Sequence, residues 1–350
     1  MKNPQYSKAA ILTELKKPLV VDLIKLPKTL KYGQVLVKLH YSGICGSQLG
    51  EIDGIKGSDK YLPHLLGHEG SGTVLDIGDG VKNVSVDDRV VLHWREGEGI
   101  NSETPKYFLQ DTEINAGWVT TFNEFAVISE NRLTKVSTAL DLKLAPLLGC
   151  AITTGFGVVE NDAKIKIGDS VVIFGSGGIG LSMIQAAKLK GAYPIIAVDI
   201  FENRLELAKE CGADHTIRHS NIEATNQTIK NFTNEGLDVF IDNTGLPEII
   251  ELGYRLIHKN GSLVLVGVPK FDQNISIHTL PIHFGKRIKG SEGGGANPSK
   301  DIPKFANLIE LKKIDVSNQV TYVCCLDDIN DAISDMRSGK AIGRTVIKFD

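Results

Sequence analysis

The sequence is poor in cysteine and in aromatic residues, and both scarcities exclude classes of protein. The 350 residues include only five cysteines, scattered and odd in number. This rules out the disulfide framework of a small secreted domain and leaves a reducing cytoplasm as the expected location. Aromatic residues make up 6% of the chain, too few to build the stacking platforms of single-strand nucleic-acid binders.

The sequence also lacks long apolar runs and an excess of charge of one sign. No run approaches the ~20 residues that span a bilayer, and residues 1–8 are polar, unlike the apolar stretch of a signal peptide. The net charge is −3, so neither nucleic acid nor an anionic membrane is an expected partner. A small molecule is the partner that remains.

The chain is long enough for two domains, and its two parts have different patterns of predicted secondary structure. Hydrophobic residues make up 42% and charged residues 23% of the chain, which is ordinary for a globular protein, and the length allows two cores. Residues 1–150 predict short strands separated by Gly, Asp and Asn, typical of a barrel or sandwich. The expected strands are residues 20–23, 34–40, 72–77 and 89–92.

After residue 150 the pattern changes to strands that alternate with helices. Regular alternation of this kind predicts a parallel, doubly wound sheet with helices on both faces. The expected strands are residues 170–174, 194–198, 215–217, 237–242 and 262–268, with helices over 202–211 and 221–235. The last part of the chain predicts a helix around residues 305–309 and a strand over 344–349.

The run Gly175-Ser176-Gly177-Gly178-Ile179-Gly180 lies between the first of these strands and a helix pattern. Gly175 permits a tight turn, Gly177 lets the backbone approach a pyrophosphate, and Gly180 lets helix and strand pack closely. Asp199 ends the next strand, where a carboxylate can accept hydrogen bonds from a ribose. The sequence therefore predicts a dinucleotide site that includes Gly175, Gly177, Gly178, Ile179, Gly180 and Asp199, and Asp199 favours NAD(H) over NADP(H).

A second candidate site consists of Cys45, His68, Glu69 and Cys150. Two thiolates and one imidazole with an open fourth position form the donor set of a catalytic zinc ion. Taken singly, a cysteine is more often a small buried apolar residue and a histidine more often a structural one. The spacing alone therefore leaves a structural interpretation open, and the neighbouring dinucleotide motif favours a metal.

Together these motifs resemble the zinc-dependent medium-chain alcohol dehydrogenases, and the resemblance extends along the whole chain. It is carried by Gly43-Ile44-Cys45, Gly67-His68-Glu69, Leu147-Leu148-Gly149-Cys150 with Thr153-Thr154-Gly155, the glycine run with Asp199, and Arg344-Thr345. The nearest branch is the one that includes class III alcohol dehydrogenases. The resemblance implies an α/β protein with a GroES-like, mostly-β catalytic domain over residues 1–150 and 293–350. It also implies a Rossmann NAD-binding domain with a doubly wound parallel sheet over residues 151–292.

The resemblance also assigns roles to single residues. Zinc would be bound by Cys45, His68 and Cys150, with Glu69 as a nearby carboxylate that can reach the metal. Ser47 matches the hydroxyl that binds the substrate alcohol and starts a proton relay, and Trp94 matches an aromatic wall of the substrate pocket. Expected cofactor contacts outside the glycine run are Arg204 beside the adenosine ribose, Arg344 on the pyrophosphate, and Val268.

Four departures from the family pattern are visible. No cysteine lies between Cys45 and Cys150, so a structural zinc is not expected. Gly46 replaces a basic residue that often contacts the pyrophosphate, and Gly50 lies close to where some members carry a relay histidine. Gln48 stands where an Asp usually orients the zinc-bound histidine, and its carbonyl could accept that hydrogen bond with a weaker electronic effect.

The sequence thus predicts a zinc- and NAD(H)-dependent oxidoreductase that acts on an alcohol or on the matching carbonyl. The charged segment 93–110, with Arg95 or Lys106 as a counter-charge, favours a polar alcohol, polyol or sugar derivative. The alternative is a catalytically silent dinucleotide-binding sensor or structural protein of the same fold. A zinc-free quinone or enoyl reductase is disfavoured by the two cysteines and the histidine, and the resemblance implies a homodimer or homotetramer.

Overall fold

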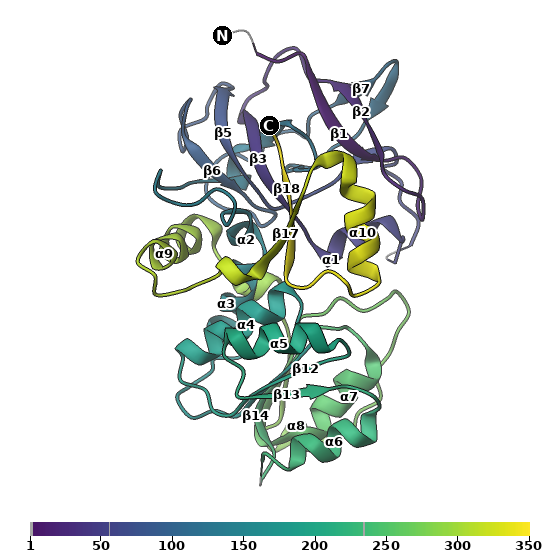
Figure 1. Ribbon diagram of the computed structural model, residues 1–350, viewed down its shortest axis with the longest axis vertical. Coiled ribbons are helices and arrows are strands. Elements are labelled where there is room, and N and C mark those ends of the chain that lie inside the picture. The colour runs from purple at the N-terminus through teal and green to yellow at the C-terminus, as the bar shows by residue number, and fades with distance from the viewer. Residues whose placement is uncertain (1–2, 56, 234) are drawn as a thin grey trace. The chain divides into compact units, whose positions relative to one another are not determined.

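The computed structural model describes residues 3–55, 57–233 and 235–350 (Figure 1). It divides into two compact units. The first comprises Met1–Cys150 and Asn297–Asp350, and the second comprises Ala151–Ala296. The return to the first unit at residue 297 comes four residues later than the predicted 293.

The first unit contains two β-sheets. The smaller sheet is antiparallel and has the order β4-β1-β2-β7-β8. Apolar side chains of this sheet, among them Ile11, Ile24 and Tyr107, form one buried cluster. The strand bounds are Tyr6–Leu12 for β1, Val20–Lys25 for β2, His64–Leu65 for β4, Tyr107–Leu109 for β7 and Thr112–Ile114 for β8.

The larger sheet of the first unit is built around β3 (Gln34–Ile44) and has the order β10-β6-β5-β3-β18-β17, with β9 also pairing with β3. The last strand, β18 (Arg344–Lys348), runs antiparallel to β3 and places Thr345 opposite Ile44. This register brings the start of β18 to the end of β3, where Cys45 follows. The remaining strands are β5 Gly70–Ile77, β6 Arg89–Leu92, β9 Phe125–Ser129, β10 Leu133–Lys135 and β17 Val320–Cys324.

Helices complete the first unit and close its larger core. The main cluster combines β3 side chains such as Val35, Val37 and Leu39 with Ile329 and Ile333 of the helix α10. The helices are α1 Gly46–Ile52, α2 Pro146–Gly149, α9 Pro298–Glu310 and α10 Ile329–Arg337. Among the described residues, no helix of either unit combines the length and apolarity needed to cross a membrane.

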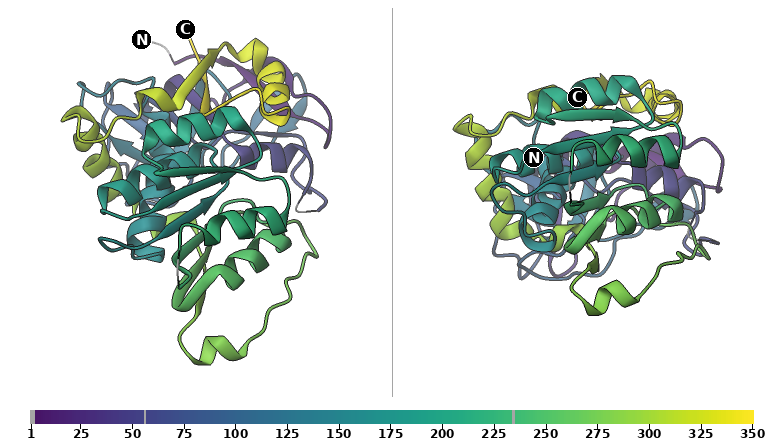
Figure 2. Two further views of the ribbon diagram at one scale, coloured as in Figure 1. Left: turned by 60° about the horizontal axis from the view of Figure 1, so that its bottom comes forward. Right: turned by 90° about the horizontal axis from the view of Figure 1, so that it is seen from below.

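The second unit is a parallel sheet between two layers of helices (Figure 2). The strand order is β13-β12-β11-β14-β15-β16, and its centre is almost wholly apolar, as is typical of strands buried on both faces. Helices α4 and α5 contact each other over one face, and α6 and α7 pack together over the other. The strands are β11 Val171–Phe174, β12 Ile195–Asp199, β13 His215–Arg218, β14 Leu237–Asp242, β15 Ile257–Leu265 and β16 Arg287–Gly290.

The helices of the second unit follow the predicted alternation. The chain enters through α3 (Ala151–Gly157) and a π-helical turn over Val158–Asp162. The helices between the strands are α4 Gly178–Leu189, α5 Glu202–Cys211, α6 Ile222–Lys230, α7 Pro247–Leu256 and α8 Leu280–His283. The doubly wound sheet predicted from the sequence is confirmed.

One strand differs from its prediction by several residues at both ends. A strand is present where residues 262–268 were predicted to form one, but the predicted bounds are wrong, because β15 begins at Ile257 and ends at Leu265. The backbone N–H groups of Val266 and Gly267 both donate to the carbonyl of Asp242, which turns the chain out of the sheet. Val268 therefore lies in a loop, where it is 60% exposed.

Candidate metal centre and cofactor loop

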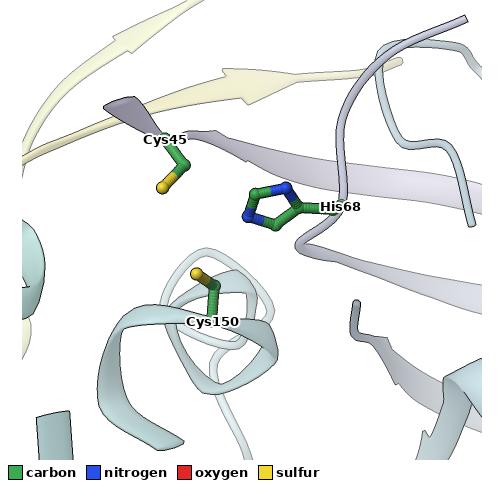
Figure 3. A group of neighbouring side chains, drawn as sticks. All are labelled: Cys45, His68 and Cys150. Atoms are coloured by element: carbon green, nitrogen blue, oxygen red, sulfur yellow. The ribbon is translucent and has the colours of Figure 1, made fainter. Parts of the chain in front are cut away.

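Three predicted metal ligands converge in the first unit. Cys45 follows β3, His68 lies in the loop between β4 and β5, and Cys150 follows α2. One possible ligand atom from each lies within 4.8 Å of the others, and Figure 3 shows the three side chains turned toward one another. Two thiol groups and an imidazole at this separation are a donor set that suits Zn²⁺.

Glycines before two of the ligands allow this approach. Gly67 has a φ of +88°, and a Cβ there would lie 2.3 Å from the hydroxyl oxygen of Thr121. A Cβ on Gly149 would lie 2.3 Å from the carbonyl oxygen of Leu92. Any larger residue at either position would push His68 or Cys150 away from the cluster.

Gln48 connects two of the ligands. Its Oε1 atom accepts a hydrogen bond from the backbone N–H of Cys45 at 3.0 Å, and its Nε2 atom lies 2.6 Å from Nδ1 of His68. The sequence leaves the Gln48 carbonyl oxygen available to the histidine, but in the structure that oxygen accepts from the backbone N–H of Cys45. The other ring nitrogen of His68, Nε2, is buried and has no hydrogen-bond partner among the described residues.

A buried ion pair lies beside the cluster. Glu69 is fully buried and Arg344 is 4% exposed, with Nε of Arg344 3.4 Å from Oε1 of Glu69. Nη1 of Arg344 also donates to the carbonyl of Ile44 at 3.2 Å. Arg344 thus lies against Glu69 in the first unit, and its expected contact with the cofactor pyrophosphate stays a prediction.

The pKa values of the two cysteines are shifted in opposite directions. A hydrogen bond from Cys150, opposed by burial and assisted by the charge of Arg344, holds the pKa of Cys45 well below its ordinary value. The same hydrogen bond and burial raise the pKa of Cys150. Burial alone lowers the pKa of His68, but the neighbouring Cys45 and Glu69 outweigh it and raise that pKa. A negative charge is therefore favoured on Cys45, as a cation ligand requires.

A cavity of about 600 Å³ in the first unit has His68 and Gln48 in its wall. Its ionisable lining groups include Glu51, Asp59, His64 and Lys106, and its aromatic ones are Tyr61 and Trp118. His64 pairs with Asp59 at 2.9 Å. Lys106 pairs with Glu113 at 2.8 Å and donates to Asn115 at 2.6 Å. The cavity thus combines charged and aromatic groups with an apolar wall that includes Leu65, Leu66 and Val119.

Two other predicted site residues, Ser47 and Trp94, do not line this cavity. Among the described residues that line it, Trp118 is present and Trp94 is not. Trp94 is half-buried, its carbonyl accepts a hydrogen bond from Arg132, and its ring lies 5.4 Å from the Arg95 guanidinium. Ser47 is exposed in the first turn of α1. Trp118 follows a Gly in an irregular segment, so no periodicity pointed to it.

The glycine run of the second unit forms a tight turn ahead of α4. Gly175 has a φ of +99°, and a Cβ on Gly180 would lie 2.1 Å from the carbonyl oxygen of Gly175. A Cβ on Gly177 would meet no atom within 4 Å, so the backbone is open to a ligand there. The hydroxyl of Ser176 is buried and has no hydrogen-bond partner among the described residues. These features fit a dinucleotide pyrophosphate above the start of α4.

Asp199 holds this turn in place as well as ending β12. Its Oδ2 accepts from the N–H of Ser176 at 2.8 Å, and its Oδ1 accepts from the N–H of Phe201 at 3.0 Å. Arg204 lies near, with Nη1 4.0 Å from Oδ2 of Asp199 and its guanidinium 4.8 Å from the Phe201 ring centre. Asp199 and Arg204 therefore share one corner of the turn.

Comparisons with known proteins decide the family. The description "Alcohol dehydrogenase GroES-like domain" matches residues 31–138, and "Zinc-binding dehydrogenase" matches residues 178–311. The S-(hydroxymethyl)glutathione dehydrogenase of Synechocystis sp. is 30% identical, with 98% of this chain and 100% of that protein covered. Alcohol dehydrogenase 6 of Peromyscus maniculatus is 31% identical, with 96% of each covered. The chain belongs to the zinc-dependent alcohol dehydrogenase family.

Solved structures of alcohol dehydrogenases share the fold. The benzyl alcohol dehydrogenase of Acinetobacter calcoaceticus is 30% identical and has a TM-score of 0.88, with 99% of this chain and 100% of that chain covered. The resemblance to zinc-dependent alcohol dehydrogenases predicted from the sequence is confirmed, and so is the combination of a GroES-like domain with a Rossmann-type domain. Membership makes the chain an oxidoreductase of the alcohol dehydrogenase class.

Proposed function

We propose that this chain transfers a hydride between NAD(H) and a polar alcohol or the matching carbonyl. The observation that carries the proposal is the cluster of Cys45, His68 and Cys150, whose ligand atoms lie within 4.8 Å of one another. His68 also lines the cavity of about 600 Å³, so one of the three ligand residues borders a space that can hold a small molecule.

The residues of the chain have separate tasks in this proposal. Cys45, His68 and Cys150 would hold one Zn²⁺ ion, which acts as a Lewis acid on an alcohol or carbonyl oxygen. Arg344 and Glu69 balance each other's charge beside the cluster. Ser47, exposed at the start of α1, carries the alcohol proton away from the reacting centre.

A test of this proposal compares metal content with turnover. We expect about one zinc per chain by elemental analysis and turnover of an alcohol panel with NAD⁺ that disappears after removal of the metal. Cys45→Ser should abolish turnover and leave NADH binding, measured by its fluorescence, largely intact. Cys211→Ser is the matched control, because Cys211 is a buried cysteine of α5 in the second unit. Full activity of metal-free protein contradicts the proposal. NADH binding without any turnover supports the silent dinucleotide-binding protein instead.

NAD(H) is the cofactor we propose in preference to NADP(H). Asp199 places a carboxylate at the end of β12, where a 2′-phosphate would meet a like charge. Arg204 favours a phosphate, but its guanidinium is already stacked on Phe201 beside Asp199. We expect kcat/KM to favour NAD⁺ in the unchanged protein and Asp199→Ser to relax this preference, with Glu202→Gln as a control. A preference of the unchanged protein for NADP⁺ would refute the assignment.

The cavity favours a polar substrate with a group that Lys106 can bind. Lys106 already bridges Glu113 and Asn115 at the cavity wall, so an anionic or hydroxyl-bearing substrate can exchange with these partners. Lys106→Met should reduce kcat/KM for alcohols with a carboxylate more than for neutral alcohols of equal size. Lys135→Met serves as control, since Lys135 pairs with Asp88 in the same unit. Equal losses for both substrate classes would remove Lys106 from substrate recognition.

We also propose that the chain forms a cytoplasmic homodimer or homotetramer through the second unit. β16 is an edge strand of its sheet, and an edge strand is a template for pairing with another chain. The segment between β15 and β16 extends away from the sheet (Figure 2) and exposes Phe271, Leu280 and Phe284. Light scattering should show an oligomer that Phe271→Asp with Phe284→Asp weakens. A monomeric unchanged protein would refute it.

A further inference from the structure

We infer that Gln48 is a positioning residue that weakens zinc binding, because its amide lies between two N–H groups in the zinc-loaded centre and turns its carbonyl oxygen to only one of them. The inference rests on the proposed zinc centre and adds a property that the ligand set alone does not have. Gln48 is 1% exposed, so water does not replace a hydrogen bond that its side chain fails to make.

The backbone sets the orientation of the Gln48 amide. The N–H of Cys45 can only donate, and the Gln48 Oε1 atom accepts from it at 3.0 Å. The amide NH₂ group then faces Nδ1 of His68 at 2.6 Å. An amide NH₂ group can only donate, so Nδ1 has to be the acceptor of this contact.

This arrangement places the hydrogen of a neutral His68 on the wrong nitrogen for metal binding. A neutral imidazole carries one N–H, and if Nδ1 accepts, that hydrogen lies on Nε2. Nε2 is the buried nitrogen, and Figure 3 shows it turned toward the sulfur atoms of Cys45 and Cys150. With this amide orientation, the lone pair of a neutral His68 lies on Nδ1 and points away from Cys45 and Cys150.

Metal binding requires the opposite arrangement. Coordination uses the Nε2 lone pair, so the ring hydrogen has to lie on Nδ1, opposite the Gln48 NH₂ group. Two donors then face each other. Rotation of the amide by half a turn brings its carbonyl to Nδ1 but turns its NH₂ group toward the N–H of Cys45. Either orientation leaves one buried donor facing another.

A carboxylate at this position would remove the conflict. Both of its oxygens accept, so Glu at position 48 could take the Cys45 N–H and the His68 Nδ1–H together. Glu has the shape of Gln. Gln48→Glu therefore replaces a hydrogen-bond donor by an acceptor and adds a negative charge, but it leaves the packing unchanged. Partners of a metal-bound histidine typically change metal affinity about ten- to a hundredfold, and we expect Gln48→Glu to lower the zinc dissociation constant by that factor.

The first experiment measures zinc affinity in the full chain. Metal-free protein and its Gln48→Glu variant are titrated with zinc in competition with a chromophoric chelator. Glu51→Gln is the matched control for charge, because Glu51 lies in the same helix and its charge acts on His68. Equal dissociation constants in the unchanged protein and Gln48→Glu overturn the inference. The inference is also overturned if Gln48→Glu raises zinc affinity by no more than Glu51→Gln lowers it.

The second experiment reads the position of the ring hydrogen in the unchanged protein and so does not depend on the variant folding. Nitrogen NMR of ¹⁵N-histidine-labelled, metal-free protein should show His68 with its hydrogen on Nε2, and zinc should move it to Nδ1. The His68 signals are assigned by their loss in His68→Gln. A metal-free His68 with its hydrogen on Nδ1 overturns the inference. Failure of the proposed function is recognised separately, as an absence of zinc binding or of turnover by the zinc-loaded protein.

Discussion

The buried pair formed by Glu69 and Arg344 makes a sharp prediction about stability. Glu69→Gln leaves a buried guanidinium without its carboxylate, and Arg344→Met leaves a buried carboxylate without its guanidinium. Both side chains are nearly inaccessible, and 3.4 Å separates Nε from Oε1. Either single substitution should therefore be much more costly than the loss of an ion pair at the surface.

The magnitude follows from the distance and the burial. Two unit charges 3.4 Å apart attract by about 5 kcal/mol at an effective dielectric constant of 20, and breaking a buried pair typically costs about 3–5 kcal/mol. The double variant removes both charges and loses the bond from Arg344 to Ile44, so it should cost only about 1–2 kcal/mol. In metal-free protein Arg344→Met should cost more than Glu69→Gln, because Arg344 also faces the negative charge favoured on Cys45.

Urea unfolding of metal-free and zinc-loaded protein gives the required free energies. The control is Lys135→Met, which breaks an ion pair whose lysine is 60% exposed and should cost less than about 1 kcal/mol. If the double variant loses as much stability as the two single variants added together, the two residues do not act as a pair. That result would refute the reasoning for this part of the metal centre.

Three further outcomes are expected. Ser47→Ala should keep its zinc and lose turnover about 10²–10⁴-fold, and steady-state rates across pH check this, since an unchanged rate would mean that another group carries the proton. Gly180→Ala should lose NADH binding and keep zinc, because its Cβ would lie 2.1 Å from the Gly175 carbonyl oxygen; unchanged NADH fluorescence contradicts this. Burial lowers the pKa of His93 to about 4 from 6.5, so its contribution to stability is present above pH 6.5 and is lost as the pH falls through 4. Unfolding free energies should fall by up to ~3 kcal/mol over this range, a slope that His93→Gln should lack.

The parts of the molecule that depend on neighbouring residues were predictable from the sequence. The glycine run, α4 and β12 form one continuous segment, so Gly175, Gly180 and Asp199 could be related by spacing alone. Helix α5 was predicted with its observed bounds, because Gly212 ends it in a left-handed conformation. The end of β15 was not predictable, since the carbonyl of Asp242 in another strand determines it.

The surroundings of the metal centre could not be predicted without the fold. Cys45, His68 and Cys150 were found by their residue types and by resemblance, but the position of Arg344 depends on the register of β18 against β3. Trp118 in the cavity wall could not be found from the sequence, because it lies in no periodic pattern, and the role expected for Trp94 stays a prediction. The hydrogen bond of the Gln48 carbonyl could not be predicted either, because its donor is the backbone N–H of Cys45 and not the side chain of His68.

The pairing of β18 with β3 has a consequence for how the metal centre is completed during synthesis. Arg344 and its hydrogen-bond partner Ile44 are 300 residues apart, whereas the second unit is one uninterrupted stretch. A ribosome that makes this chain releases Cys45, His68 and Cys150 long before the strand that supplies the guanidinium. Until then Glu69 has no Arg344 beside it, and the second unit can already fold. Contacts between such distant residues form slowly, so the buried ion pair beside the three ligand residues is completed only after almost the whole chain has been made.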